Sequence, residues 1–281
     1  MYHGWLVDNP TMLDVLEGAL GPRRNADGGF GPAASIASEP EPTAMVGVAL
    51  ADDRARAWLA EHQADDGAIT LSIGTVERDL TSVAALALGP GVTRERALDH
   101  VERLRAAPAP ATALVPIRDD LQGFPWTTHT STWTEPTAWG LLALRKHRAS
   151  AVERIDEAVT VLRDRSCVTG GWNYGNRVAF GVELPPFVQT TAIALLALRG
   201  TAEDVAEPGL AALERLWRDE SEGPLSLATA TAALRAYGSP QALPAATALR
   251  RAVAQPGGLD TMTLAWGAIA LGEGLDRMAA S

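Results

Sequence analysis

The chain of 281 residues has one cysteine, Cys167, and one lysine, Lys146. A single cysteine cannot form an intrachain disulfide, so a disulfide-stapled scaffold is excluded and a reducing compartment is expected. The first residues lack a basic stretch followed by an apolar segment, so we expect no signal peptide. The longest apolar runs, such as TAIALLAL at 191–198, are too short to cross a bilayer. We therefore expect a cytoplasmic protein without a transmembrane segment.

Basic residues are also scarce, and the net charge of −10 excludes an electrostatic nucleic-acid binder. Aromatic residues make up only 5% of the chain, yet eight of the 15 fall between residues 124 and 187. The hydrophobic fraction of 47% is ample for a core. Because no Pro- or Ser-rich linker divides the chain, we predict one domain over residues 1–281.

The chain contains an internal repeat, most visible in EPTAMVGVAL at 41–50 and EPTAWGLLAL at 135–144. With Thr43 as the reference position, six copies end near residues 50, 88, 144, 198, 234 and 271. Each copy is rich in Ala and Leu and apolar on all sides, which is typical of a fully buried helix. Amphipathic segments such as RERALDHVERLRA at 94–106 lie between the copies. The repeating unit is therefore a half-exposed helix, a Gly-rich turn and a buried helix.

The turns have a constant spacing in the first three copies. Phe30, Ala68 and Phe124 each precede the reference position of their copy by 13 residues. We therefore expect these residues to occupy equivalent places in consecutive repeats.

One segment resembles a known repeat family. RARAWLAEHQADDGAI at 54–69 resembles the QW repeat of triterpene cyclases, with Ile69 in place of the closing tryptophan. The matching residues are Arg54, Ala55, Trp58, Leu59, Gln63 and Gly67. GGW at 170–172 and DGGFG at 27–31 resemble turns of the same prenyltransferase and squalene-cyclase repeats. The resemblance implies an all-α fold, a single α/α toroid of six helix pairs, and the alternation of helix types agrees with it. The chain carries no tetratricopeptide or ankyrin signature, which favours a closed ring over an open solenoid.

The resemblance also implies a ligand and a reaction. We expect a central cavity that binds an isoprenoid or another apolar molecule and cyclises or transfers it through carbocation chemistry. The candidate catalytic residues are Glu135, Glu41 and Asp79, each two residues before its reference position. Ionised carboxylates are favoured at helix N-termini and would stabilise a developing cation. The same preference allows the alternative that these acids only cap their helices.

Two enlarged segments, 105–135 and 166–189, carry the candidate ligand-binding residues. We expect an aromatic wall of Trp126, Trp133, Trp139, Trp172 and Tyr174, with Gln189 orienting the ligand. Arg177 would meet a phosphate group, and Asp119 and Asp120 are further candidates in the same segment. The alternative is that these aromatic residues anchor long loops by packing.

The chain departs from the family pattern at the catalytic motifs. It has no Asp-x-Asp-Asp or Asp-Asp-x-x-Asp motif, and no histidine follows Cys167 to complete a zinc triad. No metal site or cofactor is evident, although Mg²⁺ would be needed if the ligand were a diphosphate. A non-catalytic carrier or a subunit that binds a protein partner is the main alternative. A carbohydrate-active toroid with paired carboxylates ranks last, because repeats near 37 residues are short for that class.

Overall fold

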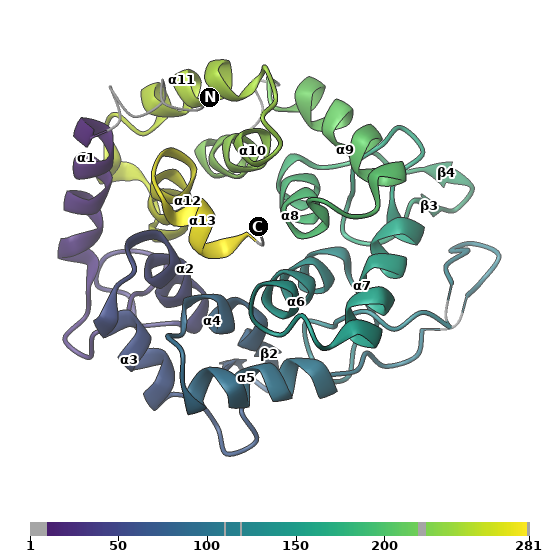
Figure 1. Ribbon diagram of the computed structural model, residues 1–281, viewed down its shortest axis with the longest axis horizontal. Coiled ribbons are helices and arrows are strands. Elements are labelled where there is room, and N and C mark those ends of the chain that lie inside the picture. The colour runs from purple at the N-terminus through teal and green to yellow at the C-terminus, as the bar shows by residue number, and fades with distance from the viewer. Residues whose placement is uncertain (1–9, 110, 119, 219–222, 280–281) are drawn as a thin grey trace.

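The computed structural model describes residues 10–109, 111–118, 120–218 and 223–279. Over these residues the main helices form two concentric rings (Figure 1). The inner ring contains α2 (Pro40–Leu50), α4 (Thr81–Ala87), α6 (Thr134–His147), α8 (Val188–Leu198), α10 (Pro224–Ala236) and α12 (Thr261–Leu271). The outer ring contains α1 (Pro10–Leu20), α3 (Asp53–Glu61), α5 (Val92–Arg103), α7 (Val152–Arg165), α9 (Glu203–Leu216) and α11 (Ala242–Ala252).

The inner ring is closed. Each inner helix contacts the next one along the chain, and the last, α12, contacts the first, α2. Five inner helices pack against the outer helix that follows them, whereas α12 packs against α1 from the start of the chain. The predicted α/α toroid is therefore confirmed, with its ends joined by the first outer helix and the last inner helix.

The composition of each helix follows from its place in the rings. The inner helices are buried on all sides, and in α8 every residue except Gln189 is buried. The outer helices bury one stripe: α5 buries Ala97, Leu98 and Val101 and exposes charged residues on its other face. Within the described residues, no helix combines the length and apolar character that crossing a bilayer requires.

The same hydrogen bond recurs in the first four repeats. In each, the backbone N–H of one turn residue donates to the side-chain hydroxyl of the threonine at the reference position, over 2.9–3.0 Å. The pairs are Phe30–Thr43, Ile69–Thr81, Phe124–Thr137 and Trp172–Thr191. We call this contact the threonine latch. In the second repeat it uses Ile69 rather than the expected Ala68, 12 residues before Thr81.

Two tryptophans meet inside the inner ring. Trp139 on α6 and Trp266 on α12 come from opposite helices, yet their ring centroids lie 6.0 Å apart. Both side chains are almost completely buried, at 1% and 2% exposure. The middle of the ring is therefore packed with side chains rather than hollow at this level.

The two faces of the ring differ. On one face, the short helix α13 (Gly274–Met278) lies against α2, α4, α6 and α12, near the C-terminal end of α2. Arg277 Nε donates to the carbonyl of Val48 over 2.7 Å, and Lys146 Nζ donates to the carbonyl of Ala279 over 2.8 Å. We call this the closed face.

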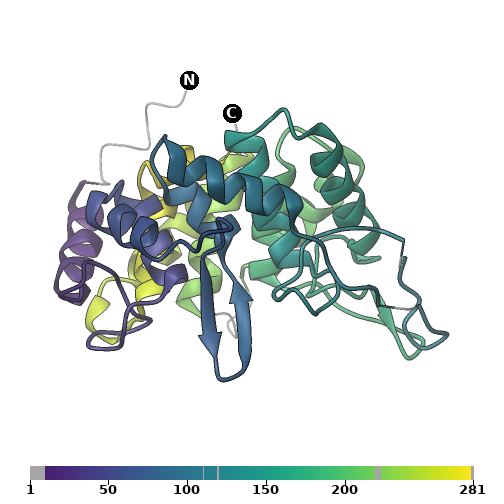
Figure 2. The same cartoon turned by 90° about the horizontal axis from the view of Figure 1, so that it is seen from below.

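The opposite face carries the long connections, and we call the N-terminal ends of the inner helices there the open rim. Figure 2 shows a β-hairpin extending from this face. It consists of β1 (Thr70–Ile73) and β2 (Val76–Asp79), paired antiparallel with Thr70 opposite Asp79. A second hairpin, β3 (Val178–Ala179) and β4 (Val182–Glu183), lies in the segment before α8. The remaining short elements are the 3-10 helices η1 (Gly21–Arg23) and η2 (Pro256–Gly258).

Candidate functional site

The open rim presents one side chain from each repeat at the position two residues before the reference position. These residues are Glu41, Asp79, Glu135, Gln189, Leu225 and Met262, in ring order. Five of them lie in the first turn of an inner helix, and Asp79 ends β2 just before α4. The rim is therefore polar over four repeats and apolar over the last two.

Glu41 forms an ion pair across the rim with Arg78 from the hairpin. Arg78 Nη1 lies 3.0 Å from Glu41 Oε2, and the two side chains are 28% and 17% exposed. The Arg78 guanidinium also stacks on the Trp126 ring, 3.9 Å from its centroid. Burial raises the pKa of the Glu41 carboxyl above its ordinary value, and the charge of Arg78 limits this rise.

Glu135 lies in a different environment from Glu41. Burial raises the pKa of its carboxyl to about 7, and the nearby negative charge of Glu41 adds to the shift. Trp139 Nε1 donates to Glu135 Oε1 over a long 3.5 Å, which compensates the charge only weakly. Glu135 is therefore suited to donate a proton near neutral pH, whereas Glu41 has a cationic partner, Arg78, which favours its carboxylate form.

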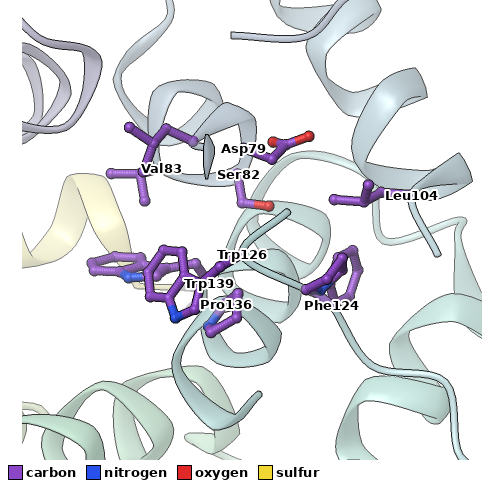
Figure 3. Close-up of a pocket in the computed structure, with 10 residues that line it drawn as sticks. Asp79, Ser82, Val83, Leu104, Phe124, Trp126, Pro136 and Trp139 are labelled. Atoms are coloured by element: carbon purple, nitrogen blue, oxygen red, sulfur yellow. The ribbon is translucent and has the colours of Figure 1, made fainter. Parts of the chain in front are cut away.

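Asp79 is engaged away from these two glutamates. One carboxylate oxygen accepts the Thr81 backbone N–H over 3.0 Å, and the other lies 2.7 Å from His100 Nε2 on the outer helix α5. Burial alone would lower the pKa of His100, but the hydrogen bond and charge of Asp79 outweigh it and raise that pKa. Figure 3 shows the Asp79 carboxylate directed away from Trp126 and Trp139. Asp79 therefore joins the hairpin to α5 rather than the glutamate pair.

A small recess lies between α4 and α6 behind the rim (Figure 3). Its lining residues are Asp79, Leu80, Ser82, Val83, Leu104, Phe124, Pro125, Trp126, Pro136 and Trp139. Its volume of about 10 Å³ admits about one water molecule. A ligand at this site would therefore lie across the rim and not inside this recess.

The long segment before α6 is fixed by one buried arginine. Arg154 on α7 is 3% exposed and donates to the carbonyls of Gly123 (2.6 Å), Gln122 (2.7 Å) and Leu104 (2.9 Å). Its guanidinium lies 3.9 Å from the centroid of the Phe124 ring. Because both ends of the segment are held by one side chain, the residues that follow Phe124 enter α6 in a defined position.

The other aromatic candidates divide between rim and core. Trp133 precedes α6 and Tyr174 lies in the loop before β3, with exposures of 37% and 59%. Trp172 lies in the core instead: it is 0% exposed, and its Nε1 donates to the carbonyl of Leu162 over 2.7 Å. The predicted aromatic wall is thus split, because the turn residue of the latch must point inward in every latched repeat.

The remaining polar candidates are dispersed. Gln189 is exposed on the rim and donates to Ser226 Oγ over 3.0 Å. Arg177 is exposed beside the β3–β4 hairpin, and Asp120 is exposed and paired with Arg118. Asp119 lies outside the described residues. Among the described residues, no group of three or more His, Cys, Asp or Glu side chains could hold a metal ion.

Sequence reasoning did not identify Arg78 or Trp266 as part of this region. Alternating residues around Gly74 in TLSIGTVER are typical of a hairpin, which would have placed Arg78 beside Asp79. Trp266 shares the tripeptide Ala-Trp-Gly with Trp139 at equivalent repeat positions. That identity was the available signal that the two indoles meet.

Comparison with solved structures finds chains of similar fold, but comparison with families and curated proteins finds no match. A solved structure of the α-1,6-mannanase GH76A of Salegentibacter sp. HEL1_6 is similar, with a TM-score of 0.61 and 11% sequence identity. The match covers 95% of this chain and 99% of that one. That protein is an inactive variant with two consecutive aspartates replaced by asparagine, bound to α-1,6-mannotriose.

These findings correct the expectations that rested on the repeat resemblance. The similar toroid is a glycoside hydrolase with an oligosaccharide ligand, so the predicted prenyltransferase and squalene-cyclase family is wrong. The predicted isoprenoid ligand and terpene-cyclase function are wrong for the same reason, and the alternative of a carrier or protein-binding subunit gains no support. The pattern of turns and helices reflects how helix pairs pack. Toroids with different activities share this packing.

Proposed function

We propose that this protein is a glycoside hydrolase whose open rim binds an oligosaccharide and cleaves one glycosidic bond. The observation that carries the proposal is the pair of rim carboxyls in unlike environments, Glu135 and Glu41. Glycosidases use two carboxyl groups, one protonated and one ionised, on either side of the scissile bond. The structural likeness to a mannanase bound to a trisaccharide supports the same class of ligand.

Glu135 is assigned as the general acid. A pKa of about 7 leaves a large fraction of this carboxyl protonated at neutral pH. It would donate its proton to the oxygen of the leaving sugar as the bond to the anomeric carbon breaks. The long hydrogen bond from Trp139 keeps the carboxyl oriented without stabilising its charge strongly.

Glu41 is assigned as the second carboxyl. Its ion pair with Arg78 favours the carboxylate, which either activates a water molecule or attacks the anomeric carbon directly. In the first case the product has inverted configuration, and in the second case configuration is retained. Proton NMR of the first-formed product anomer distinguishes these routes.

The proposal assigns glutamates because this chain holds its described aspartate doublets elsewhere. Asp52 caps the outer helix α3 and pairs with Arg24, and Asp53 starts that helix. Asp66 accepts the backbone N–H of Ala68 in the turn before β1. Neither of these doublets supplies a carboxyl at the rim position. We therefore treat α-1,6-mannan as one possible member of the proposed substrate class.

The test is hydrolysis of a panel of oligosaccharides that includes α-1,6-mannotriose, with released sugars separated by chromatography. Glu135→Gln is expected to lower kcat about 100- to 10,000-fold, which is the usual contribution of general acid catalysis. The matched control is Glu77→Gln on β2, an exposed glutamate beside the rim that should keep activity within about twofold. Full activity in Glu135→Gln, or no cleavage of any oligosaccharide by the folded wild-type protein, would refute the proposal.

A further inference from the structure

Three large aromatic side chains are exposed on the open rim between α6 and α8. Trp133, Tyr174 and Phe187 are 37%, 59% and 41% exposed. Trp133 and Phe187 are the N-cap residues of neighbouring inner helices, four residues before Thr137 and Thr191. In the first two repeats the same position holds Glu39 and Glu77. Aromatic residues thus replace carboxylates at this position only where the connecting segments are long.

Hydrogen bonds fix the backbone that carries these three rings. The backbone N–H of Trp133 donates to the carbonyl of Phe124 over 3.2 Å, and that of Phe187 donates to the carbonyl of Trp172 over 2.9 Å. Both acceptors belong to fully buried latch residues. The carbonyl of Tyr174 accepts the N–H of Thr134 over 3.0 Å, which joins the two segments. The rings are therefore exposed on a rigid support, so little conformational entropy is lost when a ligand packs on them.

Two of the rings pack together, and the backbone beside Trp133 joins them next to the proposed general acid. The Tyr174 and Phe187 rings are 5.1 Å apart with an angle of 44° between their planes. Trp133 precedes Glu135 by two residues, and the exposed amide of Gln189 follows Phe187 by two residues. Glu41 and Arg78 lie on the other side of Glu135, toward α2 and α4. A chain of sugars across the rim would therefore meet Arg78 and Trp126 on one side and these rings on the other.

We infer that Trp133, Tyr174 and Phe187 form a subsite that stacks on a pyranose ring of the oligosaccharide, adjacent to the bond that is cleaved. This inference rests on the proposed function and adds to it the direction of the bound chain, from α4 across α6 to α8. The negative face of an aromatic ring attracts the polarised C–H groups on the flat face of a sugar. Gln189 would hydrogen-bond the hydroxyl groups at the sugar's edge. The surrounding rim is rich in carboxylates, which favours a neutral sugar over an anionic one.

The inference is tested by binding, independently of turnover. We would titrate the Glu135→Gln protein with α-1,6-mannotriose, maltotriose, cellotriose and mannose, using calorimetry. Adding Trp133→Ala or Phe187→Ala should weaken binding of the preferred trisaccharide about 10-fold or more, as aromatic anchors at binding surfaces do. The matched control is Phe180→Ala, which removes a 72% exposed aromatic ring at the β3–β4 hairpin outside the subsite, and its effect should stay below about twofold.

The outcomes separate the subsite from the reaction. Trisaccharide binding that depends on Trp133 and Phe187, without hydrolysis by the wild-type protein, would support the subsite and refute the proposed function. Hydrolysis with unchanged Kd and KM in both alanine variants would refute the subsite and leave the function standing. No binding of any sugar in the panel by the folded protein would overturn the subsite. A cooperative unfolding transition in each variant checks that the fold is kept.

Discussion

The first four repeats and the last two build the same ring with different chemistry. In the first four, the reference position is a threonine whose hydroxyl binds the preceding turn, and the rim position is Glu41, Asp79, Glu135 or Gln189. In the last two, Leu227 and Leu264 occupy the reference position, and Leu225 and Met262 occupy the rim. The helix pairs pack alike in both groups of repeats, so packing alone does not require the polar residues.

The two groups of repeats differ in how the backbone N–H groups of their turns find hydrogen-bond acceptors. A longer turn that crosses the end of an inner helix buries a backbone N–H, and the threonine hydroxyl supplies its acceptor. The shorter connections end differently: Pro224 starts α10, and Asp260 caps α12 by accepting the N–H of Thr263 over 2.6 Å. The polar rim therefore coincides with the four repeats that carry the longer connections, which is also where the proposed site lies.

The largest expected effect concerns the contact between Trp139 in the third repeat and Trp266 in the sixth, which joins the two groups of repeats. Replacing either by alanine should lower the free energy of unfolding by about 3–5 kcal/mol, because each indole is buried in the middle of the ring. The double variant should lose less than the sum of the two, since both changes remove the same contact. Urea unfolding measures all three values, and strict additivity would show that the indoles pack independently.

The next effect concerns the pKa of Glu135 and depends on pH. Below about pH 4.5 the carboxyl is protonated in both states, but between pH 4.5 and 7 the unfolded state ionises first, so the wild-type protein loses stability as the pH rises. Glu135→Gln removes this penalty and should raise the free energy of unfolding by about 2–3 kcal/mol at pH 8, with no gain near pH 4. Urea unfolding at both pH values measures the difference. A gain of equal size at both pH values would contradict the raised pKa.

A smaller effect is expected at the glycines that follow the two tryptophans. A Cβ atom at Gly140 would lie 2.7 Å from the Phe124 ring, whereas one at Gly267 would lie 3.3 Å from the flexible end of Leu16. Gly140→Ala should therefore destabilise the protein by about 1–3 kcal/mol. Gly267→Ala should be neutral or stabilising by up to about 1 kcal/mol, because alanine favours a helix. Thermal unfolding of the pair measures the contrast, and equal shifts would mean that the turn does not constrain α6.

The smallest effect concerns one threonine latch. Thr137→Val keeps the shape but leaves the Phe124 N–H without its acceptor, so we expect a loss of about 1–2 kcal/mol. The control is Thr231→Val in α10, a buried threonine whose hydroxyl donates only within its own helix, to the carbonyl of Leu227. This change should cost less than about 0.5 kcal/mol. Equal losses in urea unfolding would show that the latch does not distinguish the two groups of repeats.

The fold was accessible from the sequence because it rests on local and repeated features. Apolar residues all round one helix and along one stripe of the next predict buried and half-buried helices, and six repeats of that pair fill a ring. The position of Trp133 and Glu135 at the start of α6 followed from the same pattern. The hairpin that holds Arg78 interrupts the repeat, and a helix-based pattern did not reveal it.

The ligand could not be predicted from the sequence pattern, and the resemblance to the QW repeat led to the wrong class of ligand. The residues that match the QW repeat lie in and around α3 and its turn, on the outer ring. There Trp58 donates to Asp27 over 3.0 Å, and Gln63 donates to the carbonyl of Thr93 over 2.9 Å. Such contacts join neighbouring repeats and do not reach the rim. They are therefore evidence about architecture, which does not specify a substrate.

The sequence by itself determined that six buried helices alternate with amphipathic ones, and that carboxylates stand at the start of the first, second and third buried helices. Periodicity and spacing along the chain are sufficient for that, since helix faces depend on local order. Only the tertiary structure decided which carboxylates lie close enough to influence each other's pKa. Asp79 and Glu135 occupy equivalent repeat positions, but the hairpin turns Asp79 toward His100, while burial beside Glu41 and Trp139 leaves Glu135 with a raised pKa. Direction and burial arise from neighbours distant in sequence, and those neighbours give equivalent residues different chemistry.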